Sequence, residues 1–221
     1  MIRVFDQGIE GAGLFMIEFG DIVPYFSVYT ATLFTFAIIF TLLATFSIPE
    51  KQMDIIFGGD AYYAKEIKPQ DLRFQRFVAI ACGTATLGAV VTGDIFNFTL
   101  FAAMIGITNI GIVASSRSHH VLNAAYQYGI VAMIACVPLF GGAAMILATT
   151  GTLSIWSLAG IGAAPILAKI LLLLGVMGEG MAPFYIGKAE ITRAQGAPFI
   201  LMVHVSSLLL FLRVVEIILV I

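Results

Sequence analysis

Charged residues are scarce in this chain of 221 residues. Asp, Glu, Lys and Arg together make up 11% of it, whereas an average soluble domain contains about 25%. Hydrophobic residues make up 60%, and the mean hydropathy is +1.03. A soluble protein of this length would need more polar surface than these residues can supply. The composition therefore excludes an ordinary soluble domain and predicts an all-α integral membrane protein.

Cysteine and histidine are scarce as well. The only two cysteines, Cys82 and Cys136, lie far apart in apolar stretches, and His119 and His120 are adjacent in a polar segment. Zinc sites and iron–sulfur clusters need several Cys or His residues at short, regular spacings. The sequence therefore predicts no metal site, no cofactor and no catalytic centre in this chain. Its net charge of −2 also gives no indication of a nucleic-acid partner.

Long apolar stretches are abundant. A helix needs about 20 residues to cross a bilayer, and we expect six spans, at 23–48, 74–91, 94–114, 121–149, 164–182 and 198–221. The residues before them, 1–22, mix glycines with charges and are expected to lie at the membrane interface. Residues 49–73 form the longest polar segment. They can be either a solvated loop or a docking surface for a partner subunit.

The distribution of Lys and Arg predicts an orientation. With six spans, the polar segment 49–73 shares one side of the membrane with the connections near residues 117 and 190. That side holds most of the Lys and Arg residues, and the other side holds Arg3 alone. Because cytoplasmic loops carry an excess of positive residues, we expect both termini to lie outside the cell membrane. Segment 49–73 is then cytoplasmic.

Five ionisable residues interrupt the last two apolar stretches: Lys169, Glu179, His204, Arg213 and Glu216. An ionisable group in hydrocarbon costs a few kcal/mol at least, so each needs a partner, water or a function. If the two stretches are antiparallel neighbours, a rise of about 1.5 Å per residue places Lys169, Arg213 and Glu216 at one depth. Glu179 and His204 share a second depth. We therefore predict an outer and an inner polar layer along a path for H⁺ or Na⁺.

Structural interpretations of the same residues stay open. Arg213 and Glu216 have the i, i+3 spacing of an ion pair that both residues would tolerate in lipid. Lys169 can extend its amine to the interface, and His204 can be a hydrogen-bonded core histidine. Glu179 lies between two glycines, where small residues admit water or another helix. It is the strongest of the five as a member of an ion path.

Other polar residues lie near the starts of two predicted spans. Asp94 begins the third, where an acidic residue suits the helix dipole, so it can be a cap or a member of the path. Asn123 and Gln127 lie one turn apart in the fourth, where we expect hydrogen bonds to a neighbouring helix. Gln127 is also a candidate for the ion path or its coupling.

Four short motifs occur in order along the chain. They read T-G-D-I-F-N-F at 92–98, A-A-Y-Q-Y-G at 124–129, A-T-T-G-T-L at 148–153, and G-A-P at 196–198 after Pro183. They resemble motifs of the antiporter-like membrane subunits of respiratory complex I, multisubunit Na⁺/H⁺ antiporters and membrane-bound [NiFe] hydrogenases. The resemblance implies one truncated five-helix repeat over 74–221, with a broken helix near Pro183. The first span is then an extra N-terminal helix.

The ionisable residues typical of that family are absent from the corresponding positions. Its buried glutamate falls at Ala103, and its lysine before Tyr128 is Gln127 here. Its broken-helix lysine falls at Gly178, beside Glu179. The usual relay of Glu and Lys therefore does not transfer residue by residue. Either the charges are redistributed in this chain or transport has been lost.

The resemblance extends in particular to a short antiporter-like membrane subunit of the energy-converting hydrogenase A (Eha) complex of methanogenic archaea. It implies a membrane subunit of an ion-translocating hydrogenase that couples ferredoxin reduction by hydrogen to H⁺ or Na⁺ flow. The [NiFe] centre and iron–sulfur clusters would lie in partner subunits. The alternative is a non-transporting subunit that bridges the hydrogenase arm and true antiporter subunits.

Overall fold

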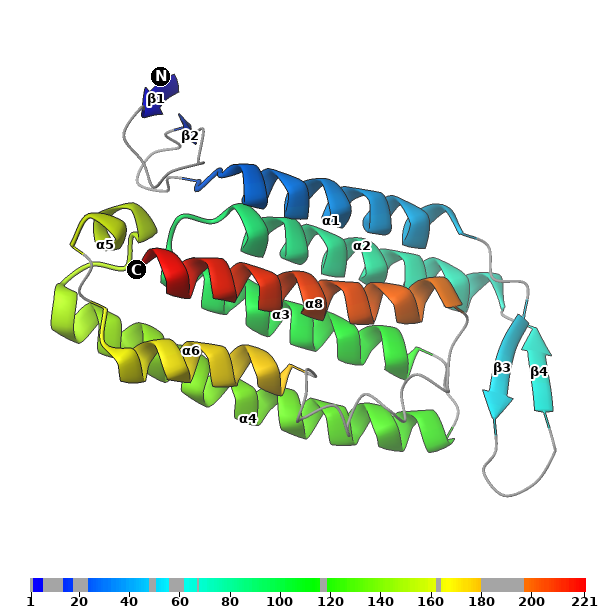
Figure 1. Cartoon of the computed structure of the whole chain (residues 1–221). Helices are drawn as coiled ribbons and strands as arrows, with labels where there is room; N and C mark the ends of the chain where they lie inside the picture. The colour runs from blue at the N-terminus through cyan, green and yellow to red at the C-terminus, as the bar shows by residue number, and fades with distance from the viewer. Residues whose placement is uncertain are drawn as a thin grey trace.

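The chain folds into a bundle of long helices with a short β-hairpin at each end (Figure 1). A computed structural model describes residues 2–5, 14–17, 24–47, 51–55, 62–66, 68–115, 119–161, 164–179 and 197–221. The helices are α1 (Val28–Phe46), α2 (Pro69–Val91), α3 (Ile95–Ala114), α4 (His119–Thr150), α5 (Ile155–Ile161), α6 (Ile166–Gly178) and α8 (Ala197–Val220). The prediction of an all-α membrane fold is confirmed.

Five helices, α1, α2, α3, α4 and α8, are long and apolar enough to cross a membrane. Each coincides with a predicted span. The predicted span 164–182 is described only in part, because α6 has 13 residues and ends at Gly178. At about 1.5 Å per residue α6 is about 20 Å long, shorter than a hydrocarbon core of about 30 Å. The predicted break near Pro183 lies outside the described residues.

Two segments contain strands that the sequence analysis did not predict. Each pair is antiparallel: β1 (Ile2–Phe5) with β2 (Leu14–Ile17), and β3 (Lys51–Ile55) with β4 (Tyr62–Glu66). The prediction of a loop over 49–73 is therefore wrong for β3 and β4, whose charged residues obscured the strand pattern. It is also wrong for the end of that segment, because α2 begins at Pro69, a residue suited to the first helical turn.

The helices alternate in direction. The start of α1, the turn from α2 to α3, the end of α4, the start of α6 and the end of α8 all lie at one end of the bundle (Figure 1). The hairpin of β3 and β4 lies at the opposite end. Both chain termini are therefore at the same end of the bundle (Figure 1).

The end that holds the termini is closed by backbone hydrogen bonds between distant segments. The amide of Ile95 donates to the carbonyl of Leu153 (3.0 Å), and the amide of Ile155 donates to that of Gly93 (2.8 Å). These bonds join the turn after α2 to the segment before α5. Helix α5 lies between the predicted spans 121–149 and 164–182, where the sequence analysis expected no helix. The two backbone hydrogen bonds hold the α2–α3 turn in position beside α8.

Helices α4 and α6 approach closely because α6 carries glycine at the contact. A Cβ atom on Gly175 would lie 2.5 Å from the Cγ of Leu139 and 2.9 Å from the carbonyl oxygen of Ala135. A Cβ atom on Gly178 would lie 2.5 Å from the Cβ of Ala135. Small residues at helix interfaces let backbones meet in this way in membranes. This close contact places the end of α6, and the adjacent Glu179, beside α4.

Candidate functional site

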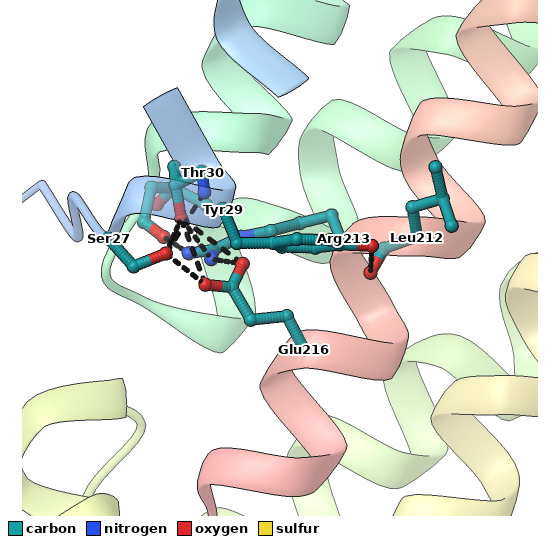
Figure 2. Close-up of polar contacts among 7 residues, drawn as sticks. Ser27, Tyr29, Thr30, Leu212, Arg213 and Glu216 are labelled. Carbon is teal, nitrogen blue, oxygen red and sulfur yellow. Dashed lines mark hydrogen bonds and ion pairs between the residues drawn. The ribbon is translucent and has the colours of Figure 1, made fainter. Parts of the chain in front are cut away.

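Arg213 and Glu216 form an ion pair one turn apart on α8 (Figure 2). The guanidinium is 0% exposed and the carboxylate side chain is 11% exposed. The i, i+3 pair predicted from the sequence is therefore confirmed. An isolated charge at this depth would be very costly, and pairing removes most of that cost.

Residues of two other elements also form hydrogen bonds with this pair. Ser27 donates to the Glu216 carboxylate, and the hydroxyl of Thr30 lies 3.1 Å from both carboxylate oxygens. Arg213 donates to the hydroxyl of Thr30 (3.1 Å) and to the carbonyl oxygen of Thr92 (2.8 Å). We call Ser27, Thr30, Thr92, Arg213 and Glu216 the polar clasp. It joins α8 to the start of α1 and to the α2–α3 turn (Figure 2).

Aromatic rings cover the clasp. The guanidinium carbon of Arg213 lies 5.0 Å from the centroid of the Tyr25 ring, within the range of a cation–π contact. The Tyr25 ring in turn lies 4.8 Å from the ring of Trp156 on α5. The charges thus lie among hydrogen-bond partners and rings rather than along an open route. The clasp supports the structural interpretation of Arg213 and Glu216.

Lys169 is bonded to α8 but is not part of the clasp. Its amine donates to the carbonyl oxygen of Ile218 (3.3 Å), two residues beyond Glu216. The Lys169 amine therefore lies near the part of α8 that carries Arg213 and Glu216, and the outer polar layer of these three residues stays a prediction. The bond places a cation near the C-terminal end of α8, where the helix dipole favours positive charge.

Glu179 is the buried acid of the bundle interior. It directly follows α6 and is 0% exposed. The hydroxyl of Tyr128 donates to its carboxylate (3.2 Å), and the hydroxyl of Ser207 donates to its backbone carbonyl (3.3 Å). Gly106 leaves room for the carboxylate, since a Cβ there would lie 2.9 Å from both carboxylate oxygens. Residues from α3, α4 and α8 therefore surround Glu179.

Glu179 lies at the middle of the bundle. Its neighbour Gly106 is near the midpoint of α3, and Ser207 is near the midpoint of α8. Gly178 packs on Ala135, near the midpoint of α4. These three helices are long and apolar enough to cross a membrane, so we expect their midpoints, and Glu179 with them, near the centre of the bilayer.

Further polar residues connect to Glu179 through Tyr128. The amide nitrogen of Asn109 donates to the Tyr128 hydroxyl (3.4 Å), and the thiol of Cys82 donates to the amide oxygen of Asn109 (3.3 Å). Ser206 lies 3.5 Å from the same amide. We call Cys82, Asn109, Tyr128, Glu179, Ser206 and Ser207 the inner polar cluster. It joins α2, α3, α4, α8 and the end of α6.

Sequence analysis missed most of this cluster. It selected Glu179 but not Asn109, Tyr128, Ser206 or Ser207, and it considered Cys82 only as a possible metal ligand. An available signal was Asn109, the amide farthest from the ends of an otherwise apolar span. Tyr128 could not be told from Tyr126, because only the packing of α4 shows which of the two is buried.

His204 lies one turn before Ser207 on α8 and is half-buried. This position places its backbone about 5 Å along the helix axis from that of Ser207, and so near the depth of Glu179. The prediction of a shared depth for Glu179 and His204 agrees with this arrangement. A contact from α8 to Glu179 is made by Ser207.

The two candidates near helix starts have different surroundings. Asp94 is the N-cap of α3, and its carboxylate accepts from the amide of Asn97 (2.9 Å). This bond supports the capping interpretation. Gln127 and Asn123 lie on the exposed face of α4, so the expected hydrogen bonds to a neighbouring helix are not formed among the residues that the structure describes.

Replacing Asp94 with alanine should destabilise the chain by about 1 kcal/mol, because an amide of the first turn of α3 loses its partner. The measurement is thermal unfolding of the full chain in detergent. Asp94→Asn is the matched control, since asparagine caps a helix as well as aspartate. If the alanine and asparagine variants unfold at the same temperature, Asp94 does not act as a cap.

Metal ligands are not clustered in the described part of the chain. Within it, no group of three or more His, Cys, Asp or Glu side chains could hold a metal ion. The polar groups of the inner cluster are hydroxyls, amides, a thiol and one carboxylate. Such groups can accept, hold and release a proton or a monovalent cation.

Comparison with known proteins gives a family and two relatives. The family model described as NADH dehydrogenase I, subunit N related protein matches residues 4–221. Uncharacterized protein MJ0522 of Methanocaldococcus jannaschii is 47% identical over 214 residues, which are 96% of this chain and 98% of that protein. Uncharacterized protein MJ1309 of the same organism is 32% identical over 135 residues, 58% of this chain and 28% of that protein.

A solved structure shares the fold. A chain of respiratory complex I from Thermus thermophilus, in a structure with bound Aureothin, superimposes with a TM-score of 0.63 at 17% sequence identity. The match covers 90% of this chain and 42% of that chain. The helical arrangement seen here therefore recurs as less than half of a longer chain.

Proposed function

The chain belongs to the NADH dehydrogenase I subunit N-related family, and we propose from this premise that it carries part of an ion path. In this proposal it is a membrane subunit of a multi-subunit, respiratory-complex-like assembly that translocates ions. Its own residues move H⁺ or Na⁺ through the middle of the membrane. Redox centres, where the assembly has them, lie in other subunits.

The observation that carries the proposal is the position of Glu179. A carboxylate that is 0% exposed at mid-membrane depth is expensive, and such residues often mark ion or proton pathways. It also follows the end of a helix too short to span, where the negative end of the helix dipole attracts cations. Broken helices in transporters place their ion sites at such ends.

The finer proposal concerns the type of assembly. The motifs over 92–98, 124–129, 148–153 and 196–198 resemble those of ion-translocating [NiFe] hydrogenases, in particular a short membrane subunit of the Eha complex. A relative that is 47% identical over nearly its whole length occurs in Methanocaldococcus jannaschii. We therefore propose a hydrogenase-type assembly, with the [NiFe] centre and iron–sulfur clusters in partner subunits.

The orientation is part of the proposal. Both termini lie at one end of the bundle (Figure 1). This agrees with the six spans that were assumed when the Lys and Arg residues on each side of the membrane were compared. Applying the positive-inside rule to that count places both termini outside and segment 49–73 in the cytoplasm.

A bridging subunit without transport is the second candidate. The observation that favours it is the apolar residue at Ala103, where the family resemblance expects a buried glutamate, together with Gly178 where it expects a lysine. In addition, Arg213 and Glu216 are engaged in the clasp. Glu179 then separates the two candidates, because a bridge would have no use for an acid at this depth.

Replacing Glu179 with glutamine tests the proposal. The variant keeps the shape and removes the charge, so it cannot bind and release a proton. We expect hydrogen-driven ion uptake into inverted membrane vesicles that carry the assembly to fall about tenfold or more. Subunit content of the purified assembly is measured in parallel.

Asp94→Asn is the matched control, since it makes the same chemical change at a residue that caps α3. It should leave ion uptake unchanged. Normal assembly and normal uptake in the Glu179→Gln variant would remove Glu179 from the ion path. The bridging role would then be the better description.

A further inference from the structure

The hydroxyl of Tyr128 lies between an acceptor and a donor. It donates to the carboxylate of Glu179 (3.2 Å) and accepts from the amide nitrogen of Asn109 (3.4 Å). The Tyr128 side chain is 1% exposed, and Asn109 and Glu179 are 0% exposed. A phenol that accepts a hydrogen bond from one side directs its own proton to the other. Asn109 therefore helps to aim the Tyr128 hydroxyl at Glu179, whose carboxylate oxygen (3.2 Å) is a closer acceptor than its backbone carbonyl oxygen (3.4 Å).

The amide of Asn109 is itself held in place. Its oxygen accepts from the thiol of Cys82 on α2 (3.3 Å), which leaves its nitrogen turned toward Tyr128. Ser206 of α8 lies 3.5 Å from the same amide. If the amide turned over, it would present its nitrogen to the Cys82 thiol and its oxygen to Tyr128. In the arrangement seen here, donation runs from Cys82 to Asn109, from Asn109 to Tyr128 and from Tyr128 to Glu179.

We propose that Tyr128, oriented by Asn109, sets the proton affinity of Glu179 and thereby the pH range over which this site works. The inference rests on the function proposed above, because it concerns the same acid. Asn109 and Tyr128 are positioning residues in this scheme. Tyr128 keeps its own proton throughout. Only the O–H bond of Glu179 forms and breaks, with a proton that arrives from and leaves to the ion path.

The physical reason is the difference between the two states of the carboxylate. A hydroxyl donor stabilises the ionised form more than the neutral form, and a hydrogen bond to a charged group is among the stronger ones. Losing it should raise the proton affinity of Glu179 about tenfold or more, by the usual strength of such bonds.

Other titratable groups also lie near Glu179. Among the described residues, α4 also carries Cys136, α2 carries Cys82, which reaches the cluster through Asn109, and α8 carries His204 one turn from Ser207. Helix α3 contributes Gly106 and Asn109, neither of which titrates. Tyr128 donates a hydrogen bond directly to a carboxylate oxygen of Glu179.

Tyr128→Phe is the direct test, because it removes one hydroxyl and keeps the ring. The control is Tyr126→Phe on the same helix, whose side chain is 69% exposed. The carboxyl band of Glu179 is followed by infrared spectroscopy of the purified assembly as the pH is changed. The band is identified by its absence in Glu179→Gln. The midpoint should move up by about one pH unit in Tyr128→Phe and stay unchanged in Tyr126→Phe.

Asn109→Ala is a second variant that leaves Tyr128 in place, and it should move the midpoint in the same direction by a smaller amount. A shift of the titration midpoint in either variant supports the proposal. If one variant does not assemble, the other provides the test. Unchanged midpoints overturn it. The proposed function fails separately, through normal ion uptake in Glu179→Gln, because the infrared titration does not depend on pumping.

Discussion

Replacing Arg213 with methionine should destabilise the chain by about 3–5 kcal/mol, the usual cost of removing one partner of a buried ion pair. The guanidinium is 0% exposed and interacts with Glu216, Thr30 and the carbonyl of Thr92. Methionine would fill much of the space but leave the Glu216 carboxylate without its cation. The measurement is denaturant or thermal unfolding of the full chain in detergent.

The double variant Arg213→Met, Glu216→Met separates charge from packing. Replacing both members of a buried pair with apolar residues is often neutral, because no charge is left uncompensated. We therefore expect the double variant to recover most of the loss. If it is as unstable as Arg213→Met alone, the clasp stabilises the chain by shape and not by its charges.

Lys169→Met is the matched control for this experiment. Its amine is half-buried and donates to one carbonyl, that of Ile218. The loss of this single bond should cost about 1 kcal/mol. An effect as large as that of Arg213→Met would mean that Lys169 compensates a buried charge that the described contacts do not include.

Replacing Gly175 with leucine should have the second large effect, on both stability and ion uptake. A side chain there meets the carbonyl of Ala135 and the amide of Leu139, both at 2.9 Å, and backbone atoms cannot turn aside as a side chain can. Overpacking typically costs about 1–3 kcal/mol, and we expect the upper end. Helix α6 would be pushed away from α4, and Glu179 would move away from Tyr128.

The measurement combines unfolding of the full chain with ion uptake by the assembly. Gly141→Ala on α4 is the control, because a Cβ there has nothing within 4 Å. It should leave uptake unchanged and stabilise the helix by about 0.5–1 kcal/mol. A Gly175→Leu variant with normal stability and uptake would show that α4 and α6 do not need to meet this closely.

Local patterns were enough for several features. Hydrophobic runs located five spans, because the length and apolar composition that a span needs can be read from each segment without reference to the others. The spacing of Arg213 and Glu216 predicted their pair, and the position of Asp94 suggested its cap, since both depend on one helix only. The strands β3 and β4 and the helix α5 were missed. Their short, mixed sequences carry little periodic signal.

By itself the sequence determined that the chain lies in the membrane, where its long helices run, and that Glu179 is an acid in an apolar setting. Only the tertiary structure decided which groups these charges contact: Arg213 and Glu216 lie against Thr30 of α1, and Glu179 lies against Tyr128 of α4. Hydropathy and spacing act within one helix. Contacts between helices depend on how each helix is rotated about its axis and how closely it packs against its neighbours. Glycines such as Gly106 leave the room that close contacts need.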